Sequence, residues 1–117
     1  MRRLVVDASV AARFLLTEDL SEKAGAVLDD YIGGKVALLA PNLIEYEVGN
    51  TLWKAVQRGF IRGAEARDRL GSFFAMGIGC LFFKAADCQR ALELATTKGV
   101  TFYDASYIVA AETATAP

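Results

Sequence analysis

The pattern of apolar and polar positions switches repeatedly between short apolar runs and longer stretches with helical periodicity. Three short runs, at 4–6, 36–40 and 78–83, predict buried strands. The remaining periodic stretches predict helices, which we expect at 8–16, 21–31, 41–58, 62–76, 86–98 and 103–113. Strands that alternate with helices favour right-handed βαβ crossovers and a mostly parallel sheet. The pattern therefore predicts an α/β fold.

Local signals mark where several of these helices begin and end. Ser21 is a typical N-cap, and Pro41 suits the first position of a helix, where its missing N–H costs nothing. Glycines at 33–34, 59 and 99 are typical of the positions that follow a helix.

Length and composition predict one domain that spans residues 1–117, because 54% of the residues are apolar and no linker or internal repeat interrupts the pattern. The formal net charge of −1 provides no overall basic field for nucleic acid. The longest uncharged stretch, 70–83, is 14 residues long and too short to span a bilayer. No convincing targeting segment precedes the first strand, so we expect a cytoplasmic protein without a membrane partner.

The two cysteines, Cys80 and Cys88, lack the spacing of a metal knuckle. Two reduced or buried thiols are the favoured interpretation. A disulfide is the alternative in a thermophilic source, where intracellular bridges occur.

Three acids lie at the edges of apolar elements in a chain that contains no histidine: Asp7, Glu47 and Asp104. Each has an ordinary structural explanation, because Asp7 can cap the next helix, Glu47 can border a buried face and Asp104 can interact with a helix dipole. Taken together, carboxylates that converge in space cannot all stay ionised without cations. Without histidine, such a site favours Mg²⁺ or Mn²⁺ over zinc or iron.

Helical geometry separates two glutamates that are neighbours in sequence. At roughly 100° per residue, Glu47 shares a narrow stripe with Leu43, Asn50 and Lys54, whereas Glu45 points roughly 160° away from Glu47. A neighbouring apolar stripe predicts the buried face of this helix, and it consists of Ile44, Val48, Leu52 and Ala55. The two glutamates therefore cannot share one site.

Three motifs in this order resemble the PIN-domain family, and specifically its VapC-type toxin group. They are Leu-Val-Val-Asp-Ala-Ser-Val at 4–10, Pro-Asn-Leu at 41–43 followed by Tyr-Glu-Val-Gly-Asn at 46–50, and Phe-Tyr-Asp-Ala-Ser-Tyr at 102–107. The resemblance covers essentially the whole chain. It implies a PIN-like α/β/α sandwich with a mostly parallel central sheet.

The resemblance also implies an activity and its partners. It indicates a Mg²⁺- or Mn²⁺-dependent endoribonuclease that hydrolyses RNA, is usually a homodimer and is held inactive by a cognate antitoxin. Asp7, Glu47 and Asp104 carry over as the catalytic, metal-binding acids. Ser9 and Asn50 carry over as hydrogen-bonding residues beside them.

The family pattern continues beyond this sequence. It places a fourth acid, in a Thr-x-Asp segment on a further strand, just after the helix of the third acid, whereas this sequence ends at Pro117. We therefore expect the domain to lack that last strand. A second interpretation follows, in which the chain is a truncated or catalytically inactive PIN-like domain that binds an antitoxin or another protein.

Positive charge and aromatic residues suggest where partners bind. Five basic residues against two acidic ones occupy 54–69, and Lys54 and Arg58 are the candidate contacts for RNA phosphate; an ordinary solvated surface is the alternative. Tyr46, Gly49 and Trp53 form a second apolar face, which predicts either contact with a dimer mate or antitoxin or burial under another helix of the same chain.

A receiver-like phosphoacceptor domain shares the alternating architecture. That class normally has an acidic pair after its first strand and a lysine late in the chain. Here a single acid follows the first strand, and no lysine follows Lys98. The metal-dependent nuclease remains the leading hypothesis; its RNA target, its number of metals and its antitoxin are left open by the sequence.

Overall fold

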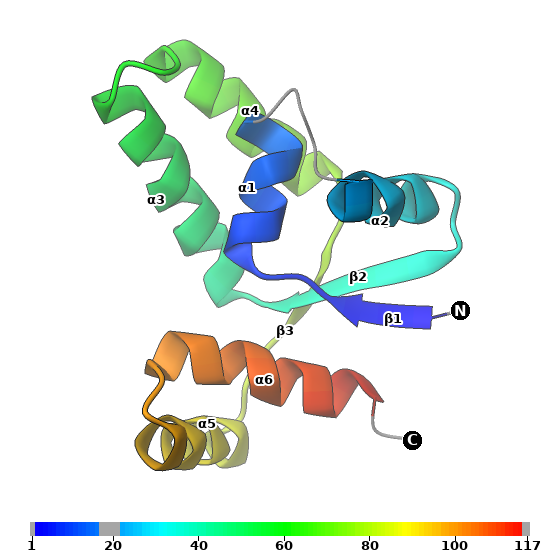
Figure 1. Ribbon diagram of the computed structural model, residues 1–117, viewed down its shortest axis with the longest axis vertical. Coiled ribbons are helices and arrows are strands. Elements are labelled where there is room, and N and C mark those ends of the chain that lie inside the picture. Colours follow the sequence, from blue (N-terminus) through cyan, green and yellow to red (C-terminus); the bar gives the residue numbers. More distant parts are fainter. Residues whose placement is uncertain (1, 17–21, 116–117) are drawn as a thin grey trace.

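Helices and strands alternate along the chain in the computed structural model, which describes residues 2–16 and 22–115 (Figure 1). Their bounds are β1 (Arg2–Val5), α1 (Ala8–Leu16), α2 (Glu22–Ile32), β2 (Val36–Pro41), α3 (Leu43–Gln57), α4 (Gly63–Ala75), β3 (Gly79–Leu81), α5 (Ala85–Lys98) and α6 (Phe102–Thr115). The predicted α/β pattern is confirmed over the described residues.

The strands form a parallel sheet in the order β1-β2-β3. Leu4 pairs with Leu38, and Leu39 pairs with Gly79. The third strand is shorter than the predicted 78–83, because its partner β2 ends at Pro41, which lies opposite Leu81. Residues after Leu81 have no strand to pair with and leave the sheet.

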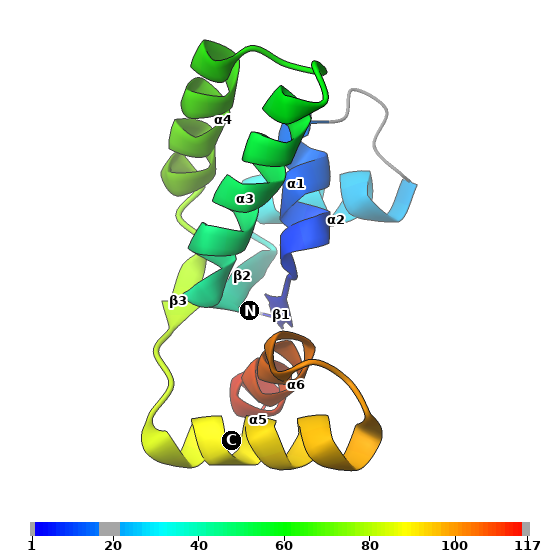
Figure 2. The ribbon, with the colours of Figure 1, turned by 90° about the vertical axis from the view of Figure 1, so that its left-hand side faces the viewer.

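Helices cover both faces of this sheet (Figure 1). The four helices α1 to α4 lie on one side, whereas α6 lies on the other side and contacts both β1 and β2. In Figure 2, α5 forms the outermost layer beneath α6, against which it packs. The layers match the predicted α/β/α sandwich.

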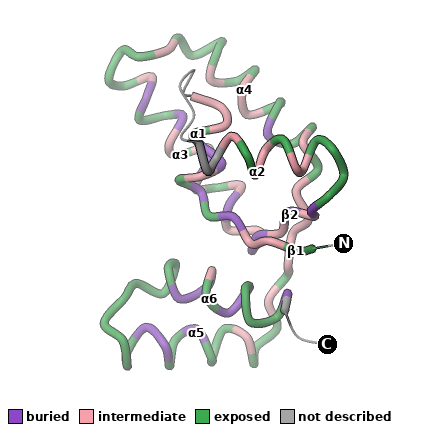
Figure 3. Tube along the Cα trace, turned by 45° about the vertical axis from the view of Figure 1, so that its right-hand side comes forward, coloured by how far each residue is buried: buried purple, intermediate pink, exposed green. Residues whose placement is uncertain are grey.

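Two hydrophobic clusters hold the layers together (Figure 3). In the first, the predicted apolar stripe of α3 is buried against β2 and α1, with Ile44 and Val48 fully inaccessible to solvent. The second joins α5 to α6 and consists of Ala91, Leu94, Ala95, Ala105 and Val109. Burial of the α3 stripe fixes the rotation of α3, and this rotation decides which way Glu47 points.

The structure corrects one predicted helix start. Pro41 is the last residue of β2, and α3 begins at Leu43 with Asn42 as N-cap. Proline lacks an N–H to donate to the sheet, and this loss is tolerated at the last position of a strand, where Pro41 lies. The predicted helix stops are confirmed at Gly34, Gly59 and Gly99, which adopt positive φ angles of 73°, 75° and 69°.

Ser21, the predicted N-cap of α2, lies outside the described residues. Within the described residues, no helix combines the length and the apolar character needed to cross a membrane.

Candidate metal and nucleic-acid site

The carboxyl ends of the parallel strands meet at one edge of the sheet. Asp7 lies two residues after the end of β1, and α3, which carries Glu47, starts two residues after the end of β2. In open parallel α/β folds, ligands bind outside the carboxyl ends of the strands. The topology thus brings the first two predicted acids to the same edge.

Asp7 is held in place by the first turn of α1. Its Oδ1 accepts a hydrogen bond from Ser9 Oγ at 2.7 Å and another from the backbone N–H of Val10 at 2.9 Å. The side chain therefore caps α1. Because a carboxylate has two oxygens with several lone pairs, capping through Oδ1 leaves Asp7 able to bind a cation. Ser9, predicted as a hydrogen-bonding residue of the site, donates to Asp7 in this structure.

Tyr107 connects Glu47 to the loop that carries Asp7. Its hydroxyl donates a hydrogen bond to Glu47 Oε1 at 2.7 Å, although the two residues are 60 positions apart in sequence. The same hydroxyl interacts with the backbone of Ala8 and with the charge of Asp7. One phenol from α6 is therefore bonded to Glu47 and lies close enough to Asp7 to respond to its charge.

This environment strongly raises the pKa of the Tyr107 hydroxyl. The largest cause is burial, followed by the hydrogen bond to Glu47, the charge of Glu47 and the charge of Asp7; the hydrogen bond with the Ala8 backbone lowers the pKa. Both acids oppose ionisation because a phenolate would place another negative charge beside them. Tyr107 consequently remains a hydrogen-bond donor throughout the neutral pH range.

Glu47 lines a groove along one face of α3, with a volume of about 360 Å³. The predicted stripe forms its floor, because Leu43, Asn50 and Lys54 line the same groove. Tyr103 closes it from the start of α6. The groove therefore combines a carboxylate, an amide and an ammonium group.

Asp104 lies in the first turn of α6 and is exposed. Its backbone N–H donates to Thr101 Oγ1 at 3.0 Å, which caps the helix. Asp104 precedes Tyr107 by three residues, and residues three apart share one face of a helix. The third predicted acid thus precedes Tyr107 by about one turn of α6, and within the described residues it does not form a three-acid cluster with Asp7 and Glu47.

Glu45 belongs to a different environment, as the helical geometry predicts. Cys80 Sγ lies 3.5 Å from Glu45 Oε1 and donates to it, on the side of α3 that faces β3. Partial burial raises the pKa of the Cys80 thiol, and the hydrogen bond to Glu45 and the charge of Glu45 raise it further. Both cysteines are free thiols; Cys80 is partly buried and Cys88 is exposed.

The basic residues at 54–69 do not form a single surface patch beside Glu47. Arg69 makes contacts within the protein instead. Its Nη1 donates to the Leu15 carbonyl at 2.6 Å, and it forms an ion pair with Glu65 at 3.8 Å. Arg58 is exposed at the end of α3. Among these basic residues, Lys54 is the one that lines the groove of Glu47.

The second apolar face of α3 is largely exposed. Tyr46 and Trp53 retain 74% and 56% of their accessible surface. Trp53 and Gly49 line a separate, mostly apolar groove of about 340 Å³ between α3 and α4, together with Ala66 and Leu70. Burial under another helix, the alternative interpretation, is therefore wrong for Tyr46 and holds only in part for Trp53.

The residues at the strand ends suit a hard divalent cation. Asp7 and Glu47 offer only oxygen atoms, and Mg²⁺ is commonly bound through one or two carboxylates while it retains several waters. Within residues 2–16 and 22–115, no group of three or more acidic, cysteine or histidine side chains is close enough to hold a metal. The chemistry of the donors fits Mg²⁺ or Mn²⁺, and much of the coordination would then come from water or substrate.

Sequence comparison places the chain among known proteins. It is 36% identical to Ribonuclease VapC3 of Pyrobaculum aerophilum over an alignment that covers 94% of this chain and 82% of that protein. The chain belongs to the VapC-type PIN family. A second relative, Exonuclease VapC9 of the same organism, is 33% identical over 87 residues, which are 72% of this chain and 61% of that protein. No family model matches the sequence.

Structural comparison agrees with this assignment of the PIN domain. The crystal structure of PAE2754 from Pyrobaculum aerophilum superposes with a TM-score of 0.65 and 30% sequence identity. The match covers 97% of this chain and 73% of that chain. The PIN-like fold expected from the three motifs is thus confirmed.

Sequence reasoning missed Tyr107 as a residue of the site. A signal was present, because Tyr107 follows Asp104 at a spacing of three within the third motif. Its role depends on the approach of α6 to α3 and to the start of α1, and a single sequence contains no information on that approach.

Proposed function

We propose that this PIN domain is a Mg²⁺- or Mn²⁺-dependent endoribonuclease, the toxin of a toxin–antitoxin pair, that acts on RNA in the cytoplasm. The observation that carries the proposal is the position of Asp7 and Glu47 around the Tyr107 hydroxyl, at the carboxyl ends of parallel strands. The two relatives, a ribonuclease and an exonuclease by name, support hydrolysis of nucleic acid as the reaction.

Asp7 and Glu47 would hold the metal ion. Asp104, in the first turn of α6, would act on it through water, because the three acids are not close enough to bind one ion together. When bound, such an ion lowers the pKa of a coordinated water and offsets negative charge on a phosphodiester. The carboxylates supply the negative charge that attracts the cation to this edge of the sheet. With no histidine in the sequence, a Ser-His-Asp triad and a two-imidazole acid–base route are excluded.

Hydrogen bonds within the chain orient both carboxylates before any ligand arrives. Ser9 and the N–H of Val10 hold Asp7, and Tyr107 holds Glu47. Outer hydrogen bonds of this kind fix the geometry of metal-binding carboxylates. Because Tyr107 keeps its proton, it does not act as a base and is a positioning residue for Glu47.

Lys54 would contact a phosphate of the RNA. Its ammonium group lies on the same face of α3 as Glu47 and Asn50, in a groove open to solvent. Phosphate contacts of this kind position a nucleic acid without reading its sequence. Arg58, one helical turn farther along α3, would extend the contact toward a neighbouring phosphate.

The exposed aromatic residues of α3 indicate a surface that binds another protein. We propose that the face of Tyr46 and Trp53 packs against a second copy of the chain or against the cognate antitoxin. Aromatic residues are enriched at protein interfaces, and the apolar groove beside Trp53 offers a concave surface.

A second candidate function is a catalytically inactive PIN-like module that binds an antitoxin or another protein. Two observations favour it: the large exposed aromatic surface of α3, and the lack, in the described residues, of three acids close enough to form a metal site. The orientation of Asp7 and Glu47 by hydrogen bonds favours the enzyme.

RNA cleavage with added metal tests the proposal. We expect the protein to cut members of a panel of structured RNAs with Mn²⁺ or Mg²⁺, to stop in excess EDTA, and to lose activity in Asp7→Asn. Asparagine retains the cap of α1, so a folded but inactive variant is expected. Cutting that persists in EDTA contradicts the metal. No cutting by the natural sequence, together with antitoxin binding, favours the inactive module.

A further inference from the structure

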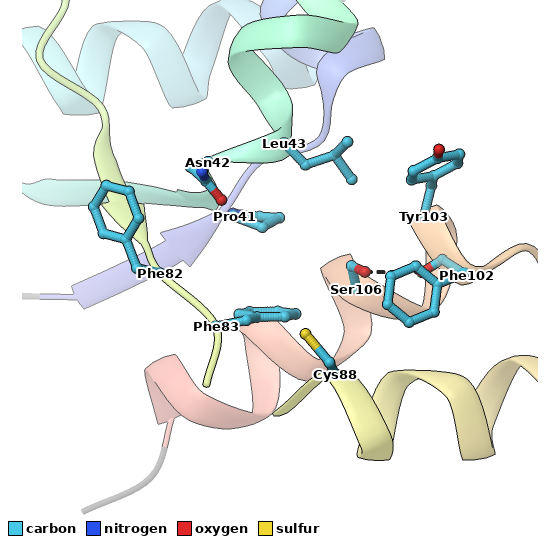
Figure 4. A pocket seen from close by; sticks show the side chains of 9 residues that line it. All are labelled: Pro41, Asn42, Leu43, Phe82, Phe83, Cys88, Phe102, Tyr103 and Ser106. Carbon is cyan, nitrogen blue, oxygen red and sulfur yellow. Dashed lines mark hydrogen bonds between the residues drawn. The ribbon is translucent and has the colours of Figure 1, made fainter. Parts of the chain in front are cut away.

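An aromatic pocket of about 300 Å³ opens beside the groove of Glu47 (Figure 4). Pro41 and Asn42 line it at the end of β2, Phe83 lines it after β3, and Phe102 and Tyr103 line it from the start of α6. Figure 4 shows the ring of Phe83 beneath Pro41, with the rings of Phe102 and Tyr103 across the space from them, at the start of α6. The pocket thus occupies the strand ends, where ligands bind in parallel α/β folds.

The pocket and the groove share two walls. Leu43 and Tyr103 line both, so a ligand can enter the pocket while an attached group lies beside Glu47 and Lys54. A single nucleotide has this form, because its base and its phosphate are covalently joined and differ in charge. The charged side chains, Lys54 and Glu47, line the groove, where Lys54 can contact the phosphate, and no charged side chain lines the pocket.

The pocket lining suits a flat, neutral ring with polar edges. Phe102 and Tyr103 contact each other edge to face, with ring centroids 6.4 Å apart, yet they retain 39% and 58% of their surface. Exposed aromatic faces of this kind stack on nucleobases. Asn42 adds an amide that does not cap α3 with its side chain and can therefore bond to a base edge.

The volume of the pocket limits the size of the ligand. About 300 Å³ lies at the lower end of the range of roughly 300–1,000 Å³ that small-molecule sites occupy. One planar heterocycle suits this space better than a helix or strand of another protein.

We propose that this pocket binds one unpaired nucleobase of the RNA, adjacent to the phosphate that lies beside Glu47. The proposal rests on the proposed ribonuclease function and adds to it the residues that hold one base, which must leave its stack to enter the pocket.

RNA binding without cleavage tests the pocket. The probe is a short single-stranded oligoribonucleotide with 2-aminopurine at one position, mixed with the full chain in EDTA so that the RNA stays intact. We expect its fluorescence to be quenched on binding. In Phe102→Ala we expect the Kd to rise by about 5- to 150-fold, the range for loss of one base–aromatic stack. Phe82→Ala, a second lining residue that is 74% exposed, should weaken binding in the same direction.

Phe60→Ala is the matched control. Phe60 is also 74% exposed but lies beyond the far end of α3, in a separate pocket with Leu16 and Glu65. We expect it to bind the probe as the natural sequence does. An RNA with an abasic site in place of 2-aminopurine should bind equally weakly to the natural protein and to Phe102→Ala. Phe102→Leu preserves apolar bulk without an aromatic ring, so it separates stacking from folding defects.

Two results would overturn the proposal. One is unchanged probe affinity in both Phe102→Ala and Phe82→Ala. The other is a change of oligomeric state in these variants, measured by sedimentation, with RNA affinity preserved, because the pocket would then be a protein interface. Cleavage is measured separately with Mn²⁺: if the natural protein does not cut but binds the probe through Phe102, the nuclease proposal fails and the base pocket stands.

Discussion

Tyr107 Oη donates a hydrogen bond to Glu47 Oε1 at 2.7 Å and so joins α6 to α3. The bond crosses the edge of the sheet where β1 and β2 end. Because the same hydroxyl interacts with the backbone of Ala8 and the charge of Asp7, it links the three elements that carry the three predicted acids.

Tyr107→Phe removes this hydrogen bond and keeps the ring. We expect the free energy of unfolding to fall by about 1–2 kcal/mol, because the bond is to a charged acceptor but is only partly buried. We expect Mn²⁺-dependent activity to fall by roughly 10- to 100-fold, as for other losses of an outer hydrogen bond to a metal ligand. Urea unfolding and a Mn²⁺ titration of RNA cleavage measure the two effects.

The raised pKa of Tyr107 predicts a loss of stability in alkali. Below pH 10 the tyrosine is protonated in both states, so its contribution to stability is fully present. Above pH 10 the unfolded chain releases the proton and the folded chain keeps it, and stability then falls by at most about 1.4 kcal/mol per pH unit until the folded protein also ionises. Unfolding at pH 9, 10 and 11 should show a steeper fall in the natural protein than in Tyr107→Phe. Equal slopes would contradict the shift.

Glu47→Gln and Glu45→Gln form a matched pair on α3. We expect Glu47→Gln to reduce RNA cleavage by at least about 100-fold, because it removes a carboxylate from the proposed metal site. Glu45→Gln should retain most activity, since Glu45 lies beside Cys80 on another side of the helix. Initial cleavage rates at saturating Mn²⁺ compare the two. Equal losses would show that cleavage depends on the total negative charge of α3 and not on the face of the helix that carries the carboxylate.

Two substitutions of Asp7 separate capping from metal binding. Asp7→Ala removes the acceptor for Ser9 and Val10 and should lower the unfolding free energy by about 1 kcal/mol. Asp7→Asn keeps an acceptor and should leave stability nearly unchanged. Both variants should lose cleavage. A cleavage loss confined to Asp7→Ala would indicate that Asp7 acts only through the helix cap; thermal melts and cleavage rates together give the answer.

Trp53→Glu tests the apolar face of α3. Because Trp53 is 56% exposed, we expect only a small change in stability and a fully folded circular dichroism spectrum. Self-association or antitoxin binding should weaken by at least about 10-fold, since a charge in an apolar interface is costly to bury. Sedimentation and titration with the antitoxin measure this. A folded variant with unaltered assembly and antitoxin affinity would refute the interface.

The sequence was informative wherever local periodicity decides the structure. The buried stripe through Ile44 and Val48 was readable from spacing alone, and it fixed the separation of Glu47 from Glu45. The end of β2 was misjudged at Pro41, because a proline is acceptable both as the last residue of a strand and as the first of a helix.

The contacts of the basic residues and the walls of the aromatic pocket depended on the tertiary structure. Spacing alone could not tell which basic residues at 54–69 face a ligand. In the structure α1 packs on α4, so Arg69 donates to the carbonyl of Leu15, whereas Lys54 lines the groove. The aromatic pocket likewise combines segments around Pro41, Phe83 and Phe102 that share no periodicity.

The sequence by itself determined the alternation of strands and helices, the family motifs and the faces of α3, because these depend on residues within a few positions of one another. Only the tertiary structure brought Tyr107 into contact with Glu47 and near Asp7, since that position depends on how α6 packs against β1 and β2. Such packing is set by the summed burial of many distant apolar side chains, and no local pattern encodes it.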